Sequence, residues 1–253
     1  MLRTLLKRWW GLLLLLLTAA LLAAAFLVPL PRTWTAVLNG TADRNIVALT
    51  FDDGPHELCT PIILDALAEI DAKATFFVSG WRLQDPVNIP ILQRTAAEGH
   101  QMGSHRYTHA EPSPTLSDEE FKAELLRTNE LIYYYTGHTV EAYRHPWGKG
   151  LARQDRIVNE LGMTVYRWDS HIADGRDFSE LNPEQTNMYV ERLMDAISDG
   201  RIVLLHDARG NVNSAAAVGI ALPIFVEKGY EFVTLERFEE LRPRQTLASI
   251  LLP

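Results

Sequence analysis

The sequence predicts an α/β domain in which parallel strands alternate with helices. Apolar runs of strand length alternate with amphipathic segments of helical length along most of the chain. The chain has 253 residues, of which 47% are apolar, so it can hold one domain of about 220 residues and a short appendage. We find no internal repeat or low-complexity linker. We therefore expect seven strands and six intervening helices in one domain.

The appendage is the N-terminal segment, residues 1–32. Residues 9–28 form a run of 20 without a charge, enough at ~1.5 Å per residue to cross a hydrocarbon layer of ~30 Å. Basic residues stay on the cytoplasmic side of a membrane, and three of them precede the run: Arg3, Lys7 and Arg8. We expect a single-pass membrane anchor and an extracytoplasmic domain, residues 33–253, that is periplasmic or at the cell surface. A cleaved signal peptide is the alternative, since residues 23–25 are alanines, and it would make the protein secreted.

The composition limits the partners of the chain. All 32 acidic residues but only 20 of the 24 basic residues follow position 32, so the predicted exported part has a formal charge of −12. Nucleic acid is therefore not expected as a partner. The single cysteine, Cys59, cannot form an intramolecular disulfide, and the fold must depend on its core. Neither observation predicts an oligomeric state.

The predicted strands and helices follow in order along the chain. The first helix is expected to begin at Thr60 as its N-cap, with Pro61 at the first helical position. Ser117 and Glu120 form a capping box for the third helix, which Gly137 ends. The strands are predicted at residues 46–51, 74–78, 101–104, 141–144, 164–168, 202–206 and 231–234. The helices are predicted near residues 60–70, 85–99, 117–135, 153–161, 183–198 and 214–228.

Polar side chains collect at the predicted carboxyl ends of these strands. In a closed parallel barrel those ends share one face, where active sites are built, so residues more than 150 positions apart are expected to converge. The residues at these ends are Asp52, Asp53, His105, His109, Arg144, Asp169, Asp174, Asp177 and His206.

The two adjacent aspartates and the two histidines suggest a metal site. One carboxylate and two imidazoles are a common ligand set for a catalytic divalent ion that keeps an open position for water. The second carboxylate would take the proton of that water. Each feature alone has a simpler explanation, because Asp-Gly-Pro forms turns and histidines four apart can share a helix surface. Their common place at strand ends favours the metal site.

Five segments in this order resemble the motifs of the polysaccharide deacetylases with NodB homology, carbohydrate esterase family 4. The resemblance covers roughly residues 45–234. It implies a deformed (β/α)7 barrel and hydrolysis of an N-acetyl group on an amino sugar of a polymer. The segments are Thr50 to Pro55, His105 to His109, Arg144 to Gly148, Asp174 to Phe178 and Leu204 to Asp207.

The resemblance implies roles for the residues closest to the chemistry. Asp53, His105 and His109 match the metal ligands of the family, which usually hold zinc and sometimes cobalt or another divalent ion. Asp52 matches the general base. His206 matches the general acid.

The resemblance also implies residues that surround this centre. Arg144 and Asp177 match the pair that orients and tunes the base and the acid, with Asp174 as the alternative to Asp177. Leu204 matches the wall of the pocket for the acetyl methyl group. Trp147 is a candidate substrate-binding residue, because exported glycan-binding clefts often place an aromatic face against a sugar.

The expected activity is metal-dependent removal of N-acetyl groups from N-acetylglucosamine in peptidoglycan or an exported polysaccharide. The expected partners are an N-acetylated glycan polymer and, through the N-terminal helix, the membrane. Two alternatives remain: an amidohydrolase of the same barrel that acts on a small amide or imide, and an exported carbohydrate-binding protein without turnover. Retention of both acid and base disfavours the second alternative. Two positions depart from the family pattern: Arg106 replaces a Ser or Thr that braces the histidine loop, and Phe178 replaces a Trp.

Overall fold

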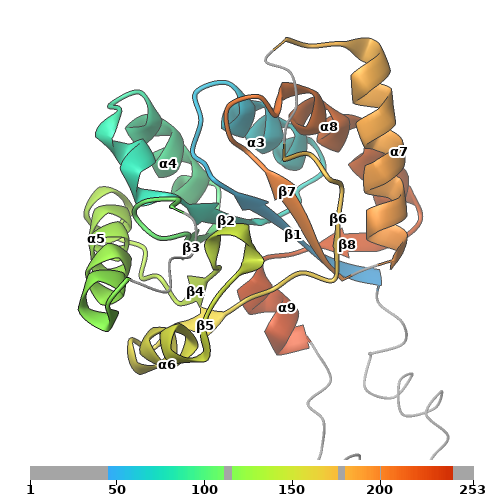
Figure 1. Cartoon of the computed structure of the whole chain (residues 1–253). Coiled ribbons are helices and arrows are strands. Elements are labelled where there is room, and N and C mark those ends of the chain that lie inside the picture. Colours follow the sequence, from blue (N-terminus) through green and yellow to red (C-terminus); the bar gives the residue numbers. More distant parts are fainter. Residues whose placement is uncertain (1–44, 111–115, 176–179, 200, 242–253) are drawn as a thin grey trace, which may run out of the picture. The chain divides into compact units, whose positions relative to one another are not determined.

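The computed structural model describes residues 45–110, 116–175, 180–199 and 201–241 (Figure 1). The chain divides into two compact units, and all described residues belong to the second, Asn45–Pro253. The predicted anchor, residues 1–32, and the predicted domain start at residue 33 lie outside the described residues. Of the helices that the structure describes, none combines the length and the apolar character needed to cross a membrane.

A parallel sheet of eight strands forms the centre of the fold. Strand β1 (Asn45–Asp52) lies in its middle and pairs with β2 (Thr75–Val78) on one side and β7 (Ile202–His206) on the other. The order along the sheet is β5-β4-β3-β2-β1-β7-β6, and β8 (Tyr230–Phe232) pairs with the start of β1. The other strands are β3 (Gln101–Ser104), β4 (Ala142–Tyr143), β5 (Thr164–Val165) and β6 (Ser170–His171).

The sheet differs from the expected seven-stranded barrel at its two edges. Within the described ranges, β5 pairs only with β4, and β6 pairs only with β7. The parallel α/β architecture is confirmed, but the sheet is an open half-barrel instead of a closed ring. Strand β6 was not predicted, because its two residues, Ser170 and His171, are polar and form no apolar run.

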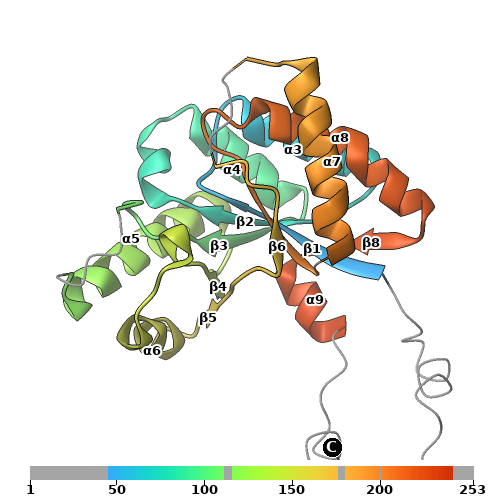
Figure 2. The same cartoon turned by 45° about the vertical axis from the view of Figure 1, so that its right-hand side comes forward.

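The helices lie close to their predicted places and pack in a row. Helix α8 packs against both α7 and α3, and α5 packs against both α4 and α6. Figures 1 and 2 show α7, α8 and α3 side by side in both views. The bounds are α3 (Cys59–Glu69), α4 (Asn88–Ala97), α5 (Asp118–Thr136), α6 (Ala152–Glu160), α7 (Pro183–Asp199), α8 (Val212–Glu227) and α9 (Leu235–Leu241), with short 3-10 turns η1 (Gly80–Gln84) and η2 (Pro146–Gly148).

The alternation of side chains along β1 separates an outer face from an inner face. The outer face packs with residues of α3 and α8 and contributes Val47, Leu49 and Phe51. On the inner face, Ile46 and Ala48 belong to a cluster that includes residues of α9. Because successive side chains of a strand point to opposite faces, Thr50 and Asp52 share this inner face. The strand thus carries an apolar core residue at its start and a buried carboxylate at its end.

The two predicted helix starts had different outcomes. The capping box is confirmed, because Ser117 Oγ accepts from the Glu120 N–H at 3.2 Å and the Ser117 N–H donates to Glu120 Oε2 at 2.8 Å. The N-cap prediction for Thr60 is wrong. Helix α3 begins two residues earlier, at Cys59 with Leu58 as its N-cap, and Thr60 Oγ1 donates to the buried carboxylate of Asp207 at 2.7 Å. A long-range polar partner has replaced the local capping role.

Shortening Leu49 tests whether β1 is the centre of the core. Leu49 is fully buried, so we expect Leu49→Ala to lower the free energy of unfolding by ~2–5 kcal/mol through lost burial and a cavity. Ile220→Ala, at a site on α8 that is 48% exposed, is the control and should stay within ~0.5 kcal/mol. Urea titration measures both. Equal effects of the two substitutions would contradict the central place of β1.

Candidate active site

The three predicted metal ligands converge at the carboxyl end of the sheet. Asp53 follows β1, and His105 and His109 lie on the loop after β3. Asp53 Oδ1 lies 3.0 Å from His109 Nε2 and 3.4 Å from His105 Nε2. The three ligand atoms all lie within 4.8 Å of one another, and in the described part of the chain they form the one group with such spacing.

A backbone turn at Asp53 brings both aspartates to the same place. Neighbouring residues of a regular strand point to opposite faces, yet His105 Nε2 lies 3.4 Å from Asp53 Oδ1 and 3.8 Å from Asp52 Oδ2. The change occurs because Asp53 has a φ of 76°, in the left-handed region that ends the strand. The carboxylates of Asp52 and Asp53 therefore both lie near the His105 imidazole.

The residues present fit a divalent metal ion. His105 Nδ1 lies 2.9 Å from the carbonyl oxygen of Arg144, and since a carbonyl only accepts, Nδ1 carries the proton and the lone pair of Nε2 faces Asp53. Asp53 Oδ1 is buried and has no hydrogen-bond partner among the described residues. One carboxylate and two imidazoles suit zinc or cobalt.

The electrostatics of the ligand set favour the protonation states that bind metal. Burial opposes ionisation of Asp53, but the nearby imidazoles of His105, His109 and His206 outweigh it and hold the pKa of Asp53 below its ordinary value. Burial lowers the pKa of His109, against the opposing charge of Asp53. At neutral pH the carboxylate is thus ionised and the His109 imidazole is neutral.

Asp52 is held by a buried arginine. Asp52 is 3% exposed and Arg144 is fully buried. Arg144 Nη1 donates to Asp52 Oδ1 at 2.8 Å and to Thr50 Oγ1 at 2.7 Å. The rest of the guanidinium donates to the carbonyl oxygens of Tyr166 and Arg167 at 3.4 and 3.3 Å. One Asp52 oxygen is therefore engaged, and the other, Oδ2, is the one that faces His105.

His206 lies beside Asp52 in the register of the sheet and is a cation at neutral pH. Asp52 of β1 and His206 of β7 are paired residues. Asp174 holds His206 by two contacts, at 2.7 Å between Oδ1 and Nδ1 and at 3.0 Å between Oδ2 and the backbone N–H. Burial lowers the pKa of His206, but Asp174, Asp52 and Asp53 outweigh it and raise the pKa to about 9.

The aspartates after β5 differ from one another in their place. Asp174 contacts His206, whereas Asp177, the residue first matched to the tuning role, lies outside the described residues. Asp169 does not join the site, because its Oδ2 accepts from the backbone N–H groups of Arg201 and Ile202 at 3.1 and 2.9 Å. Among the described aspartates of this segment, Asp174 is thus the one that contacts His206.

The two predicted substrate-binding residues lie beside this centre. Leu204 precedes His206 by two positions on β7, so both side chains lie on the same face of the strand, and Leu204 is 6% exposed. Trp147 in η2 is 55% exposed. Its ring centroid lies 5.1 Å from that of His109. The indole is thus an open aromatic surface next to a proposed ligand.

Asp207 is a site residue whose contacts the sequence does not reveal. Its backbone N–H donates to the Asp52 carbonyl oxygen at 3.1 Å, and its side chain accepts from Thr60. Burial raises the pKa of Asp207 to about 7, with nearby carboxylates adding to the effect and the Thr60 hydrogen bond opposing it. A Cβ on Gly54 would lie 2.0 Å from Asp207 Oδ2, so this close approach needs glycine. Gly54 and Asp207 were visible as motif residues, but their contact was not.

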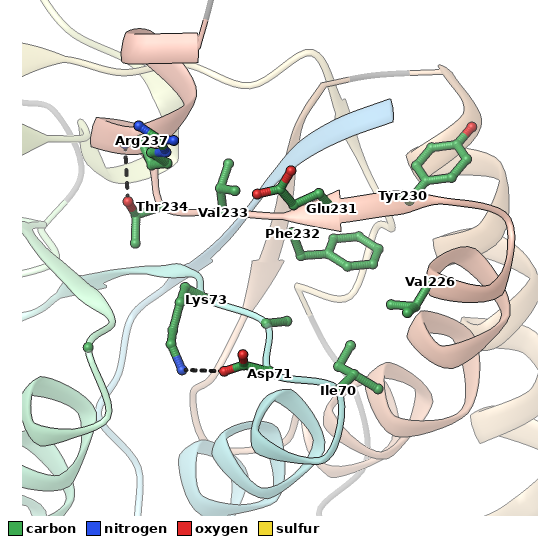
Figure 3. Close-up of a pocket in the computed structure, with 12 residues that line it drawn as sticks. Ile70, Asp71, Lys73, Val226, Tyr230, Glu231, Phe232, Val233, Thr234 and Arg237 are labelled. Atoms are coloured by element: carbon green, nitrogen blue, oxygen red, sulfur yellow. Dashed lines mark hydrogen bonds and ion pairs between the residues drawn. The ribbon is translucent and has the colours of Figure 1, made fainter. Parts of the chain in front are cut away.

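A pocket lies at the opposite end of the sheet from these residues. It is bordered by the segment before β2 and by β8, which pairs with the start of β1 (Figure 3). Its charged side chains include Lys73 and Asp71, which pair at 3.6 Å. Asp53, His105 and His109, the metal-ligand group found in the described residues, do not line this pocket. The candidate site is therefore at the carboxyl end.

The chain is similar to a known class of proteins. A family model described as polysaccharide deacetylase matches residues 39–166. The chain belongs to the polysaccharide deacetylase family.

Three relatives illustrate the similarity. The chain is 32% identical over 191 residues to the peptidoglycan-N-acetylglucosamine deacetylase PgdA of Listeria monocytogenes, with 75% of this chain and 38% of PgdA covered, so it spans about two fifths of that relative. It is 37% identical over 169 residues to a chitooligosaccharide deacetylase of Rhizobium leguminosarum, with 66% and 74% covered. The structure of a family 4 acetyl xylan esterase from Clostridium thermocellum, in complex with a cobalt ion, matches with a TM-score of 0.67 and 29% identity over 78% of this chain and 91% of that one.

Removing the carboxylate of Asp174 tests the charge state of His206. In the metal-free protein we expect His206 to titrate near pH 9, and Asp174→Asn should lower this pKa because it removes the negative charge that stabilises the imidazolium. Because the pKa of His206 is higher in the folded protein than in the unfolded chain, the imidazolium stabilises the fold. This stabilisation is complete below pH ~6.5 and is lost as pH rises through about 9. The stability difference between wild type and Asp174→Asn should therefore shrink over that window.

NMR titration of the imidazole and urea titrations across pH measure these two effects. Asp155→Asn is the matched control, because Asp155 pairs with His145 at 2.7 Å and should leave His206 unaffected. A His206 pKa that does not change in Asp174→Asn would contradict the assignment.

Proposed function

We propose that this domain removes N-acetyl groups from N-acetylglucosamine units of peptidoglycan or another exported polysaccharide by metal-dependent hydrolysis. The observation that carries the proposal is the convergence of a three-ligand set with a buried carboxylate and a histidinium. An acetamide is a poor electrophile with a poor leaving group, so its hydrolysis needs an activated water, a base and an acid. The substrates in the names of the relatives support the amino-sugar class.

Asp53, His105 and His109 are the proposed holders of a divalent ion, zinc or cobalt. What such an ion supplies when bound is polarisation of the substrate carbonyl and a lowered pKa, from ~15.7 towards ~7, for a water in its open position. Support comes from the donor set, from the buried Asp53 Oδ1 that accepts no hydrogen bond and from the cobalt ion in the related esterase structure.

Asp52 and His206 divide the proton transfers. Arg144 holds Asp52 Oδ1, so Oδ2 is the oxygen available to take a proton from the attacking water. His206 carries an extra proton, and Asp174 fixes its Nδ1, so Nε2 is the atom that protonates the departing amine. The attacking water gives its proton to Asp52, and the departing nitrogen takes one from His206 because an unprotonated amide anion could not leave, so both groups are needed.

Two side chains are proposed to contact the substrate. Leu204, beside His206 on the inner face, forms an apolar wall for the acetyl methyl group. The exposed ring of Trp147 offers a face on which a sugar stacks.

We also propose that the domain acts outside the cytoplasmic membrane, where peptidoglycan and exported glycans lie. The uncharged run at residues 9–28 and the basic residues before it support this location.

Substitution of one aspartate and one histidine separates chemistry from metal binding. Asp52→Asn should reduce acetate release by ~10²–10⁴-fold, the usual contribution of a general base, and leave metal content unchanged. His105→Ala should lose both metal and activity, whereas His138→Ala, on a residue outside the site, should keep both. Acetate release from chitooligosaccharides and from peptidoglycan, with and without chelator, is measured beside metal content. No chelator-sensitive acetate from either substrate would refute the proposed activity, and turnover of small amides alone would favour the other substrate class.

The location has its own expected outcome. A retained anchor predicts that the protein in the membrane fraction keeps its N-terminal segment, because the uncharged run is long enough to span the bilayer. Mass spectrometry of the mature N-terminus measures this. A mature chain that begins near residues 24–26 would show a cleaved signal peptide instead.

A further inference from the structure

The loop that carries two of the proposed ligands has an unusual residue at Arg106. Arg106 has a φ of 65°, in the left-handed region that non-glycine residues seldom adopt. It is buried, with 3% of its surface exposed. A guanidinium in such a place is costly unless its charge is paired and its N–H groups are bonded. The partners of Arg106 therefore decide how the loop between His105 and His109 is held.

Glu124 of α5 is the ionic partner of Arg106. Arg106 Nε donates to Glu124 Oε2 at 2.6 Å, and Thr108 Oγ1 donates to Glu124 Oε1 at 2.5 Å. Arg106 Nη2 also donates to Thr108 Oγ1 and to the carbonyl oxygen of Ala110, both at 3.3 Å. The Glu124 carboxylate thus connects Arg106, which follows His105, with Thr108, which precedes His109.

The helix that carries Glu124 is firmly packed. Helix α5 begins with a capping box, and Phe121 and Leu125, on either side of Glu124 in sequence, are fully buried. The middle of the loop is attached to the same helix, because the Arg127 guanidinium carbon lies 3.6 Å from the centre of the Tyr107 ring. The loop is therefore fastened at residues 106, 107 and 108 to one rigid element.

We propose that Arg106 and Glu124 are positioning residues that keep His105 and His109 at the spacing a metal ion requires. Removing the Glu124 carboxylate would release both anchors and leave a buried guanidinium unpaired. The loop would then relax, and the imidazoles would leave their place beside Asp53. This inference rests on the proposed metal site, but neither Arg106 nor Glu124 has a role in the proposed reaction.

Metal affinity tests the inference without reference to turnover. Glu124→Gln keeps the shape of the side chain and removes its charge, and we expect ~10–100-fold weaker Zn²⁺ binding, the loss usual when a partner that orients a ligand is removed. Arg106→Met should have a similar effect. The double variant should be no weaker than the more affected single variant, because both substitutions remove the same anchor. Competition with a chromophoric chelator measures the dissociation constants.

The controls carry the same charge changes at exposed positions. Glu130→Gln on α5 and Arg156→Met on α6 should bind Zn²⁺ as wild type does. A merely structural pair would lower the melting temperature of the metal-free variants and leave the affinity of the folded protein unchanged, and that result would overturn the inference. Should Arg106→Met not fold, Glu124→Gln and Thr108→Val decide by the same criterion.

The failure of this inference differs from the failure of the proposed function. Wild-type protein that binds no Zn²⁺ would remove the metal site and the inference together. Wild-type binding with unchanged affinity in Glu124→Gln would remove the inference alone.

Discussion

The buried ion pair between Arg144 and Asp52 is the constraint on which the site depends. Arg144 follows β4, and its guanidinium is buried. Its partners are Asp52 at the end of β1 and the carbonyl oxygen of Arg167 in the segment after β5. Burial of an ion pair is tolerated when nearly every N–H finds an acceptor, and loss of one partner typically costs ~3–5 kcal/mol. The open half-barrel therefore brings its strand ends together around a charge that must be satisfied.

The same arginine reaches the metal-binding side through its backbone. Its carbonyl oxygen accepts from His105 Nδ1, which leaves Nε2 to face Asp53, while its side chain holds one oxygen of Asp52. The two adjacent carboxylates thus differ in their surroundings. Asp52 is paired with a fixed cation, and Asp53 has a buried oxygen without a hydrogen-bond partner. This asymmetry is the physical basis for the proposed division between base and ligand.

Much of this arrangement was predictable because strand ends and motif spacing are local properties. The convergence of Asp53 with His105 and His109, the partnership of Arg144 with Asp52 and the order of strands and helices all followed from the sequence pattern and the family resemblance. Strand β6 did not, because two polar residues gain their strand conformation only from pairing with β7. The contact of Asp174 with His206 could not be chosen in advance, since Asp174 and Asp177 lie three positions apart in one loop and look alike in sequence. The contact between Arg106 and Glu124 joins a loop to a helix, and no residue spacing in the sequence predicts it.

The distinct roles of the two aspartates are tested most directly by locating the metal itself. Crystals of the zinc-loaded protein, measured at the zinc absorption edge, should show one ion bound by Asp53 oxygen at ~2.0–2.2 Å and by Nε2 of His105 and His109 at ~2.0–2.1 Å. Asp52 should remain on Arg144 and outside the ligand set. An ion bound by Asp52, or an anomalous peak away from the two histidines, would contradict the proposed division of roles.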